Sequence, residues 1–310
     1  MIVNTSVPIT AASCDRMIQD IVKTYPFCRT ELLTASAFQR PIRTLVIGQG
    51  PRKVIYTAAH HANEWITALI LLKFGEELAS AIDSGGEIFG IGARELSQKA
   101  TIYMVPMVDP DGVDLVVGAI RPGEIQYNLA RNLADSYPTI PFPDGWKANL
   151  LGIDLNLQYP AGWLQAREIK FSQGYTRPGP RDYVGRAPLD QLESRALVGY
   201  TEFIDPDMIL AYHSQGKEIY WQFQDYDVPG AKQLGETFAR LSGYTLADVP
   251  YASGFAGYKD WFIQRLRKPG YTIEVGEGVN PLPLSQFDEI YRDNLGILVS
   301  GALPENFNVS

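Results

Sequence analysis

The chain has 310 residues, of which 45% are hydrophobic and 20% are charged, a balance typical of a globular protein with a full apolar core. Its net charge of −8 argues against nucleic acid as a partner, because phosphate binding requires a basic face. No run reaches the roughly 18 apolar residues of a membrane span, and the N-terminus lacks the features of a secretion signal. We therefore expect a soluble cytoplasmic protein, or an extracellular one if a signal has been removed. Cys14 and Cys28 are too few for a disulfide framework, although they could form one bridge.

Segments typical of helices and strands alternate along the first third of the chain. Apolar residues recur at helical spacing in one long segment, whereas short apolar runs bounded by Gly, Pro or polar residues predict strands. Ser13 is placed to cap the first helix. The expected order is a helix at 13–25, strands at 44–50 and 53–59, a helix at 63–82, and a strand at 101–108 that ends in the turn "DPDG".

The middle of the chain, residues 120–207, is rich in Pro and Gly and has one strong helical segment, 189–204. After it the alternation resumes, with strands expected at 208–214, 218–223 and 271–276 and helices at 230–244, 258–266 and 286–303. This pattern predicts an α/β fold in which helices cover both faces of a mixed or parallel sheet. In such sheets the working residues gather at the carboxyl ends of strands.

Two of the three histidines lie in the segment "HHANEW". His61 and Glu64 follow a predicted strand at a spacing that lets both side chains reach one ion. Imidazole and carboxylate ligands suit zinc, which in catalytic sites takes three protein ligands and leaves a place for water. His213, at the end of another predicted strand, is the candidate third ligand. The ordinary alternative is that His60 and His61 are polar residues at a helix start, with Glu64 in its first turn.

Two acidic residues elsewhere fit the same site. Asp154, in "GIDLN", could orient a ligand histidine through the second ring nitrogen. Glu274 lies in an otherwise apolar strand, where a lone carboxylate is costly unless it is paired or functional. It is a natural general base for an activated water. Glu277 is the alternative acid, but it follows Gly276 and is expected in a loop.

Five segments together resemble the zinc carboxypeptidase family, in the order in which that family carries them. They are "HANEW", "GIDLN", "AYHS", "YASGFAGYKDW" and "YTIEV". The resemblance implies one zinc-peptidase catalytic domain over residues 1–310, with a central mixed, twisted eight-stranded sheet flanked by helices on both faces. It also implies one zinc ion on the three candidate ligands, with Glu274 as the base and Tyr251 closing over the substrate. His60 would then be a neighbour of the metal rather than a ligand.

Three positions depart from the pattern of that family. Leu157 follows the Asn of "GIDLN", where an arginine of the family helps to clamp the terminal carboxylate of the substrate. Leu150 and Leu151 lie near the place of its oxyanion arginine, and Asn63 replaces the arginine of "HAREW". Because bidentate contacts between arginine and carboxylate are hard to replace, we do not expect this chain to bind an ordinary C-terminal carboxylate in the usual way.

Other segments resemble one subgroup, the bacterial γ-D-glutamyl-diamino acid endopeptidases, which cut peptidoglycan stem peptides between D-glutamate and diaminopimelate. These segments are "WKAN", "GIDLNLQYPAGW", "GPRDYVG", "AYHSQG", "GYKDW" and "GVNPLP". Lys259 lies where the family sets its specificity for the residue after the cut, and a cation there suits a carboxylate of diaminopimelate. The alternative is a solvated lysine at a helix start, which the helix dipole disfavours.

Further substrate contacts are expected from Arg181 and Asn156. Arg181 is the preferred arginine of the Gly- and Pro-rich loop, where Arg177 and Arg186 are alternatives; any of them could replace the oxyanion arginine or be solvated at the surface. Asn156 matches the Asn of the family and is expected to contact a substrate carboxylate, unless it only bonds its own backbone in a turn.

The sequence therefore predicts a zinc metallopeptidase that hydrolyses the γ-D-glutamyl–diaminopimelate amide of stem peptides, with Glu274 assisting the attack of a zinc-bound water. The expected partner is a peptide derived from peptidoglycan, and recycling of such peptides fits the expected location. Two alternatives are a zinc carboxypeptidase that removes acidic C-terminal residues and a zinc-containing peptide-binding protein without turnover. A serine hydrolase is disfavoured, because the chain lacks a G-x-S-x-G elbow and zinc would use two of its histidines.

Overall fold

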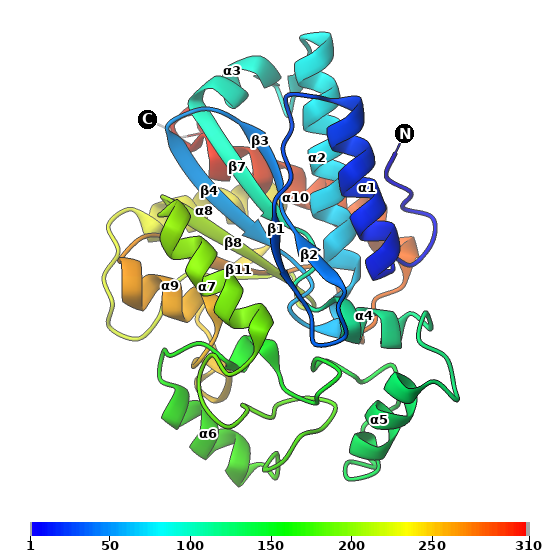
Figure 1. The fold of residues 1–310 in the computed structure, drawn as a ribbon. Helices are drawn as coiled ribbons and strands as arrows, with labels where there is room; N and C mark the ends of the chain where they lie inside the picture. The colour runs from blue at the N-terminus through cyan, green and yellow to red at the C-terminus, as the bar shows by residue number, and fades with distance from the viewer. Residues whose placement is uncertain (1, 308–310) are drawn as a thin grey trace.

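Seven strands form the central sheet of the computed structural model, which describes residues 2–307 (Figure 1). Across the sheet they lie in the order β10 (Thr245–Ala247), β9 (Glu218–Tyr220), β11 (Gly270–Glu274), β8 (Met208–His213), β4 (Arg52–Thr57), β7 (Ala100–Val105) and β3 (Leu45–Gly48). Strands β7, β4, β8 and β11 run parallel to one another, and β10 is parallel to β9. Strands β3 and β9 pair antiparallel with β7 and β11, so the sheet is mixed.

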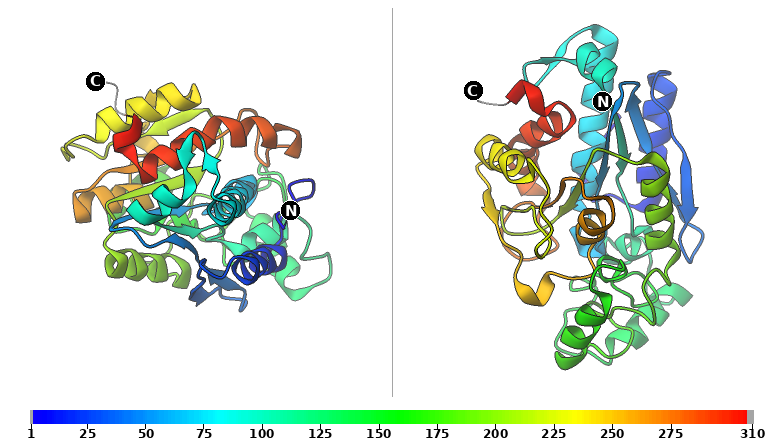
Figure 2. Two further views of the ribbon diagram at one scale, coloured as in Figure 1. Left: turned by 90° about the horizontal axis from the view of Figure 1, so that it is seen from above. Right: turned by 90° about the vertical axis from the view of Figure 1, so that its left-hand side faces the viewer.

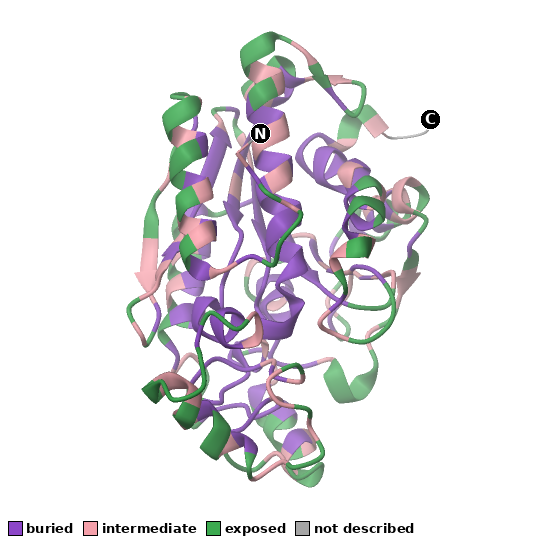
Figure 3. Cartoon of the chain, turned by 90° about the vertical axis from the view of Figure 1, so that its right-hand side faces the viewer, coloured by how far each residue is buried: buried purple, intermediate pink, exposed green. Residues whose placement is uncertain are grey.

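Each face of the sheet has its own apolar core, because successive residues of a strand point to opposite faces. Val54 and Tyr56 of β4 pack in one core, whereas Ile55 lies in the other. The first core is covered by α1 (Ala11–Thr24), α2 (Ile66–Ser84), α8 (Ala231–Ser242) and α10 (Phe287–Ala302), and the second by α7 (Leu192–Ile204) and α9 (Tyr258–Leu266) (Figure 2). Figure 3 shows buried residues along the strands and exposed residues on the outer sides of the helices. The predicted mixed sheet between two helical layers is thus confirmed.

The implied eighth strand is missing from the central sheet as described over residues 2–307. Beyond the edge strand β3 there is only an isolated bridge, in which Arg29 and Val46 exchange backbone hydrogen bonds of 2.9 and 2.8 Å. The chain that follows Arg29 forms β1 (Leu32–Ala35) and β2 (Pro41–Arg43), which pair with each other. The expected count was therefore one too high, because this segment pairs in its own hairpin instead of extending the ladder.

The helices differ from the predictions at their ends and in the middle of the chain. Helix α1 is capped by Thr10, and Ser13 completes a capping box as its third residue, so the prediction that Ser13 is the N-cap was wrong. The loop-rich middle contains two helices that were not predicted, α5 (Ile125–Ala134) and α6 (Trp163–Ser172). None of the helices between residues 2 and 307 is long and apolar enough to cross a membrane. Shorter elements are β5 (Glu87–Ile88), β6 (Ile91–Gly92), α3 (Ala93–Lys99) and α4 (Pro110–Val116), the last starting at the predicted "DPDG" turn.

The carboxyl ends of β4, β8 and β11 meet at one edge of the sheet, because these strands are parallel. The ladder places Glu274 opposite His213. Helices α5 and α6 lie beyond this edge, in the lower part of Figure 1. The middle segment of the chain therefore covers the strand ends at which the sequence predicted a functional site.

Cys14 and Cys28 are both buried and unpaired. Burial raises the pKa of each thiol to about 12. The single bridge that two cysteines could have formed is therefore not made, and stability comes from the two apolar cores.

Glu193, in the first turn of α7, is a buried acid that should make stability depend on pH. Its side chain is 2% exposed, and its Oε1 atom has no hydrogen-bond partner. Burial, assisted by the nearby charge of Asp111, raises its pKa to about 7. In the unfolded chain it would ionise at about pH 4.3. Stability should therefore fall as pH rises from the unfolded to the folded pKa, because only the unfolded chain loses the proton there, and it should stay reduced above.

We expect Glu193→Gln to stabilise the protein by about 1 kcal/mol or less at about pH 5 and by about 3 kcal/mol at about pH 8. Urea unfolding at the two pH values measures the difference. Glu202→Gln is the matched control, because Glu202 lies on the same helix but is exposed. An equal effect of Glu193→Gln at both pH values would contradict the prediction.

Candidate metal centre

His61, Glu64 and His213 converge at the edge where β4 and β8 end. After β4 the backbone turns at Ala59, with a φ of 46°, into a short 3-10 helix (Ala62–Glu64) that carries Glu64 at its end and His61 as its N-cap. The Nδ1 atom of His61 lies 2.9 Å from Oε1 of Glu64, and Nδ1 of His213 lies 2.9 Å from Oε2. One ligand atom from each residue lies within 4.8 Å of the others. The structure thus brings together the three residues that the sequence singled out.

The donor set fits zinc. Two imidazole nitrogens and a carboxylate are the kind of ligands that a catalytic zinc ion takes from a protein. The two Nδ1 atoms lie only 3.2 Å apart, so both histidines face the same point, and all three side chains are buried. Lone pairs of two nitrogens and two oxygens that converge in a buried place are satisfied best by a cation.

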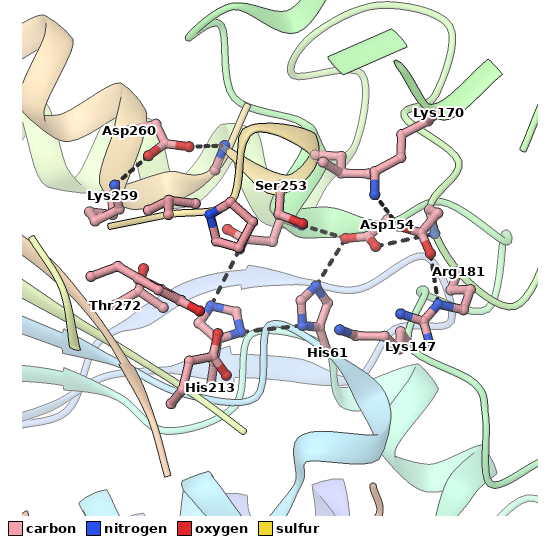
Figure 4. A pocket seen from close by; sticks show the side chains of 18 of the residues that line it. His61, Lys147, Asp154, Lys170, Arg181, His213, Ser253, Lys259, Asp260 and Thr272 are labelled. Carbon is pink, nitrogen blue, oxygen red and sulfur yellow. Dashed lines mark hydrogen bonds and ion pairs between the residues drawn. The ribbon is translucent and has the colours of Figure 1, made fainter. Parts of the chain in front are cut away.

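Asp154 holds His61 from the side away from the cluster (Figure 4). Its Oδ1 atom lies 3.1 Å from Nε2 of His61. The backbone N–H groups of Asn156 and Asp182 donate to Oδ1 and Oδ2 of Asp154, which fixes the carboxylate in place. When Nε2 of His61 donates to Asp154, Nδ1 carries the lone pair that a metal requires.

His60 packs behind the cluster. Its Nε2 atom lies 3.1 Å from the hydroxyl of Tyr159, and its ring stacks on that of His213 at 5.6 Å. It is fully buried and its nitrogens do not join the group of candidate ligands. The structure therefore places His60 as a neighbour of the cluster.

The charged groups of the cluster shift one another's pKa values. Burial alone would lower the pKa of His61, but Glu64 and Asp154 together raise it to about 9. Burial opposes ionisation of Glu64, but His61 and Lys147 hold its pKa well below the usual range. Glu64 is therefore ionised, and the centre favours bound positive charge.

Glu274 ends β11 and faces the same cavity as the cluster. Over residues 2–307 its carboxylate has no hydrogen bond or ion pair within the protein, in contrast to Asp154 and Glu64. Burial and the negative charge of Glu64 raise its pKa to about 8. The positive charge of a bound metal ion would lower this pKa, and an ionised carboxylate with uncommitted oxygens at a cavity wall can accept a proton and return it. Glu277, the alternative acid, is exposed and does not line this cavity in the described structure.

Lys147 is a candidate that the sequence argument overlooked. Its Nζ atom lies 3.1 Å from Oε1 of Glu64, and it lines the cavity beside the cluster. Burial alone would lower its pKa, but Glu64 raises it, so the amine is charged. The sequence argument looked for an arginine in "WKANLLG" and found Leu150 and Leu151, of which Leu150 is in fact buried in an apolar core. The lysine of the same segment, Lys147, was the signal from which this cation could have been found.

A cavity of about 410 Å³ opens in front of the cluster. Figure 4 shows Lys259, Asp260 and Thr272 toward one end and Lys170 and Arg181 toward the other. A second hollow of about 820 Å³ adjoins it. The wall that both hollows share is formed by Lys147, Tyr175, Arg181, Tyr220 and Glu274.

Lys259 lines the cavity but is not a solvated lysine, because it is 4% exposed. Its Nζ atom donates to the carbonyl of Gln222 at 2.6 Å and to Oδ1 of Asp260 at 2.5 Å. The alternative of a solvated lysine was therefore wrong, and the contact of Lys259 with the substrate stays a prediction. The wall presents a paired cation and anion, since Asp260 neutralises the charge.

Asn156 and Tyr251 are placed differently from each other. Asn156 lines the cavity, but its Oδ1 accepts the backbone N–H of Tyr258 at 3.0 Å, and its Nδ2 lies 3.4 Å from Nε2 of His213. The side chain of Asn156 is therefore already held by Tyr258 and His213, and it does not hydrogen-bond its own backbone as a turn residue would. Tyr251 is 74% exposed, packs edge-on against Phe255, and lies outside the described cavity wall. The structure does not bring Tyr251 to the cluster.

Of the three loop arginines, Arg181 reaches the cavity. Its Nε atom donates to Oδ2 of Asp182 at 2.7 Å. The other oxygen of Asp182 pairs with Lys170 at 2.6 Å, a contact that the sequence argument missed. Arg177 and Arg186 line neither of the two hollows of the described cleft.

Residues 14–296 match the sequence model of the zinc carboxypeptidase family. The chain belongs to this family. Gamma-D-glutamyl-L-diamino acid endopeptidase 1 of Lysinibacillus sphaericus is 41% identical over 288 residues, which are 92% of this chain and 70% of that protein. The uncharacterized protein YqgT of Bacillus subtilis (strain 168) is 35% identical over 289 residues, 93% of this chain and 75% of that one.

Solved structures share the fold. Thrombin activatable fibrinolysis inhibitor superposes with a TM-score of 0.73 at 16% identity, over 97% of this chain and 75% of that one. Murein-tripeptide amidase MpaA of Escherichia coli O157 superposes with a TM-score of 0.53 at 17% identity, over 87% of this chain and 91% of that one. The protein is therefore a zinc metallopeptidase with a carboxypeptidase-like α/β fold.

Asp154→Ala should weaken zinc affinity by about 10- to 100-fold, because His61 loses the partner that fixes its ring and tautomer. Competition with a chromophoric zinc chelator measures the affinity. Asp83→Ala, a change of an exposed acid far along α2, should leave it unchanged. Unaltered affinity in Asp154→Ala would show that His61 needs no support from this carboxylate.

Proposed function

We propose that the protein hydrolyses the γ-D-glutamyl–diaminopimelate amide of peptidoglycan stem peptides. The observation that carries the reaction type is Glu274, an acid without a protein partner among residues 2–307, in the cavity that His61 and His213 of the buried cluster also line. The substrate class is supported by the relative that is 41% identical and is named a gamma-D-glutamyl-L-diamino acid endopeptidase. Leu157, which lines the cavity where the family has a carboxylate-binding arginine, argues against an ordinary carboxypeptidase.

His61, Glu64 and His213 would hold the zinc ion. Zinc, when bound, supplies Lewis acidity that activates water and polarises a carbonyl group. Asp154 keeps His61 oriented through the hydrogen bond at Nε2. Glu274 takes the proton of the attacking water on its carboxylate and returns it to the amine that leaves.

Lys147 stabilises the negative charge that develops on the carbonyl oxygen of the scissile amide. Its ammonium group lies on the cavity wall 3.1 Å from Oε1 of Glu64, and because the side chain is only 19% exposed, water screens its charge little. A fixed cation in such a place supplies the charge that the missing arginine would have supplied. Lys147 thus takes the role of the oxyanion arginine that is missing from "WKANLLG".

The arm of the cavity that ends at Lys259 and Asp260 receives the diamino acid. The far end of diaminopimelate carries both an ammonium and a carboxylate group. A buried wall with a paired lysine and aspartate offers a partner of opposite charge to each of them. The pair therefore suits a zwitterionic group better than a simple acidic side chain.

The first test is mass spectrometry of L-Ala-γ-D-Glu-meso-diaminopimelate after incubation with zinc-loaded protein. We expect release of free diaminopimelate, and we expect Glu274→Gln to lower kcat by about 100- to 10,000-fold while it keeps its zinc. An α-linked acidic peptide should resist cleavage. If the α-linked peptide is cut instead, the protein is a carboxypeptidase; if neither is cut, it binds peptides without turnover. A tripeptide with lysine in place of diaminopimelate should be a poorer substrate, and equal rates would refute the role of Lys259 and Asp260.

Lys147→Met should lower kcat on the γ-linked tripeptide by about 100- to 1,000-fold with little change in KM, since the cation acts on charge that appears in the transition state. Lys147→Arg, which keeps the charge, should recover part of the rate. Zinc content is measured in each variant, because Lys147 also contacts Glu64. A Lys147→Met enzyme with full zinc and full kcat would exclude this role.

A further inference from the structure

Arg181 lies where the two hollows of the cleft meet. It lines both of them together with Lys147 and Glu274. Figure 4 shows the side chains of Arg181 and Lys147 next to each other on the His61 side of the cavity. The Arg181 side chain is 38% exposed, so a substrate in the cleft can reach it.

The charge of Arg181 is only partly compensated within the protein. It contacts Asp182 through Nε alone, and Asp182 is already paired with the largely buried Lys170 at 2.6 Å. Within residues 2–307, the terminal nitrogens of Arg181 have no hydrogen-bond acceptor. An anion bound at the terminal nitrogens would satisfy the guanidinium group.

A γ-linked glutamyl residue supplies such an anion at the right place. Its α-carboxylate is free and lies at most about 5 Å from the scissile carbonyl carbon. An α-linked glutamyl residue carries its side-chain carboxylate at a similar distance, whereas other α-linked residues and α-amidated glutamyl residues have no anion there. With the diamino acid in the arm of Lys259, the glutamyl residue extends past the shared wall of Glu274, Lys147 and Arg181. A guanidinium fork matches a carboxylate by two parallel hydrogen bonds.

We propose that Arg181 binds the α-carboxylate of the γ-linked glutamyl residue and so selects substrates in which this carboxylate is free. This inference rests on the proposed function, which it deepens by assigning recognition of the glutamyl carboxylate to one side chain. Asp182, which is itself paired with Lys170, holds the guanidinium group in place, while Lys147 stabilises the charge on the scissile carbonyl. The same contact would discriminate against glutamyl residues whose α-carboxylate is amidated.

The test compares L-Ala-γ-D-Glu-meso-diaminopimelate with the same tripeptide carrying an α-carboxamide on the glutamyl residue. For the wild type we expect kcat/KM to be about 10- to 100-fold higher for the free carboxylate, because hydrogen bonds to charged groups are strong. Arg181→Gln should lower kcat/KM for the carboxylate substrate, mainly through KM, to within about 3-fold of the amide, whose rate should hardly change. Arg181→Lys should be intermediate. Arg177→Gln, in the same loop but outside the two hollows, is the control.

Binding of the two uncleaved tripeptides to zinc-loaded Glu274→Gln, with and without Arg181→Gln, gives a readout that does not depend on turnover. The preference for the carboxylate should appear in the dissociation constants and vanish with Arg181. If the wild type cleaves the γ-linked peptide but Arg181→Gln and Arg181→Lys both keep the preference, the inference is wrong and the proposed function stands. If the wild type does not cleave the γ-linked peptide, the proposed function fails and the inference falls with it. Equal loss on both substrates would show that Arg181 only supports the fold.

Discussion

The parallel pairing of β4, β8 and β11 is the constraint on which the site depends. Parallel strands end at the same edge of a sheet, so residues that are far apart in the sequence arrive at one place. The ladder between β8 and β11 sets Glu274 opposite His213. A slip of one residue in this ladder would turn Glu274 to the other face of the sheet, into an apolar core. Catalytic geometry is therefore protected by the packing of two separate cores against the two faces.

Three lysines beside the cavity are each paired with an acid. Lys147 lies against Glu64, Lys170 against Asp182, and Lys259 against Asp260. Buried ion pairs add little to stability, because desolvation offsets most of their attraction. Their concentration around one cavity fits the highly charged substrate that we propose. Arg181 differs from these lysines in that its side chain is 38% exposed at the cleft wall and its terminal nitrogens have no acceptor among residues 2–307.

The metal cluster could be predicted because its chemistry is rare in this chain. With only three histidines in the whole sequence, His213 and the pair of His61 with Glu64 were strong candidates, and an acid within an apolar strand marked Glu274. The alternation of helices and strands likewise predicted the layered fold. The eighth strand came from resemblance alone, and the pairing of β1 with β2 that replaces it depends on contacts beyond the reach of a local pattern.

The polar contacts around the cluster could not be predicted in the same way. Lys147, Lys170 and Arg181 lie in the loop-rich middle of the chain, where no periodicity determines which side chains meet. The contacts of Lys259 could not be predicted either, because the carbonyl of Gln222 that accepts its hydrogen bond comes from a distant segment. Thr10 and Ser13 are both good capping residues, and only the backbone distinguishes the cap from the third residue of the helix.

The burial of Cys14 and Cys28 has a practical side. A thiol whose pKa is about 12 is almost entirely in its unreactive protonated form at neutral pH, and here it is also shielded from solvent. The native protein should resist maleimides and similar reagents until the core between α1 and the sheet opens. Alkylation rates would then report global opening without any engineered probe. Because both thiols are buried, they would not compete with the His–Glu–His cluster for added metal.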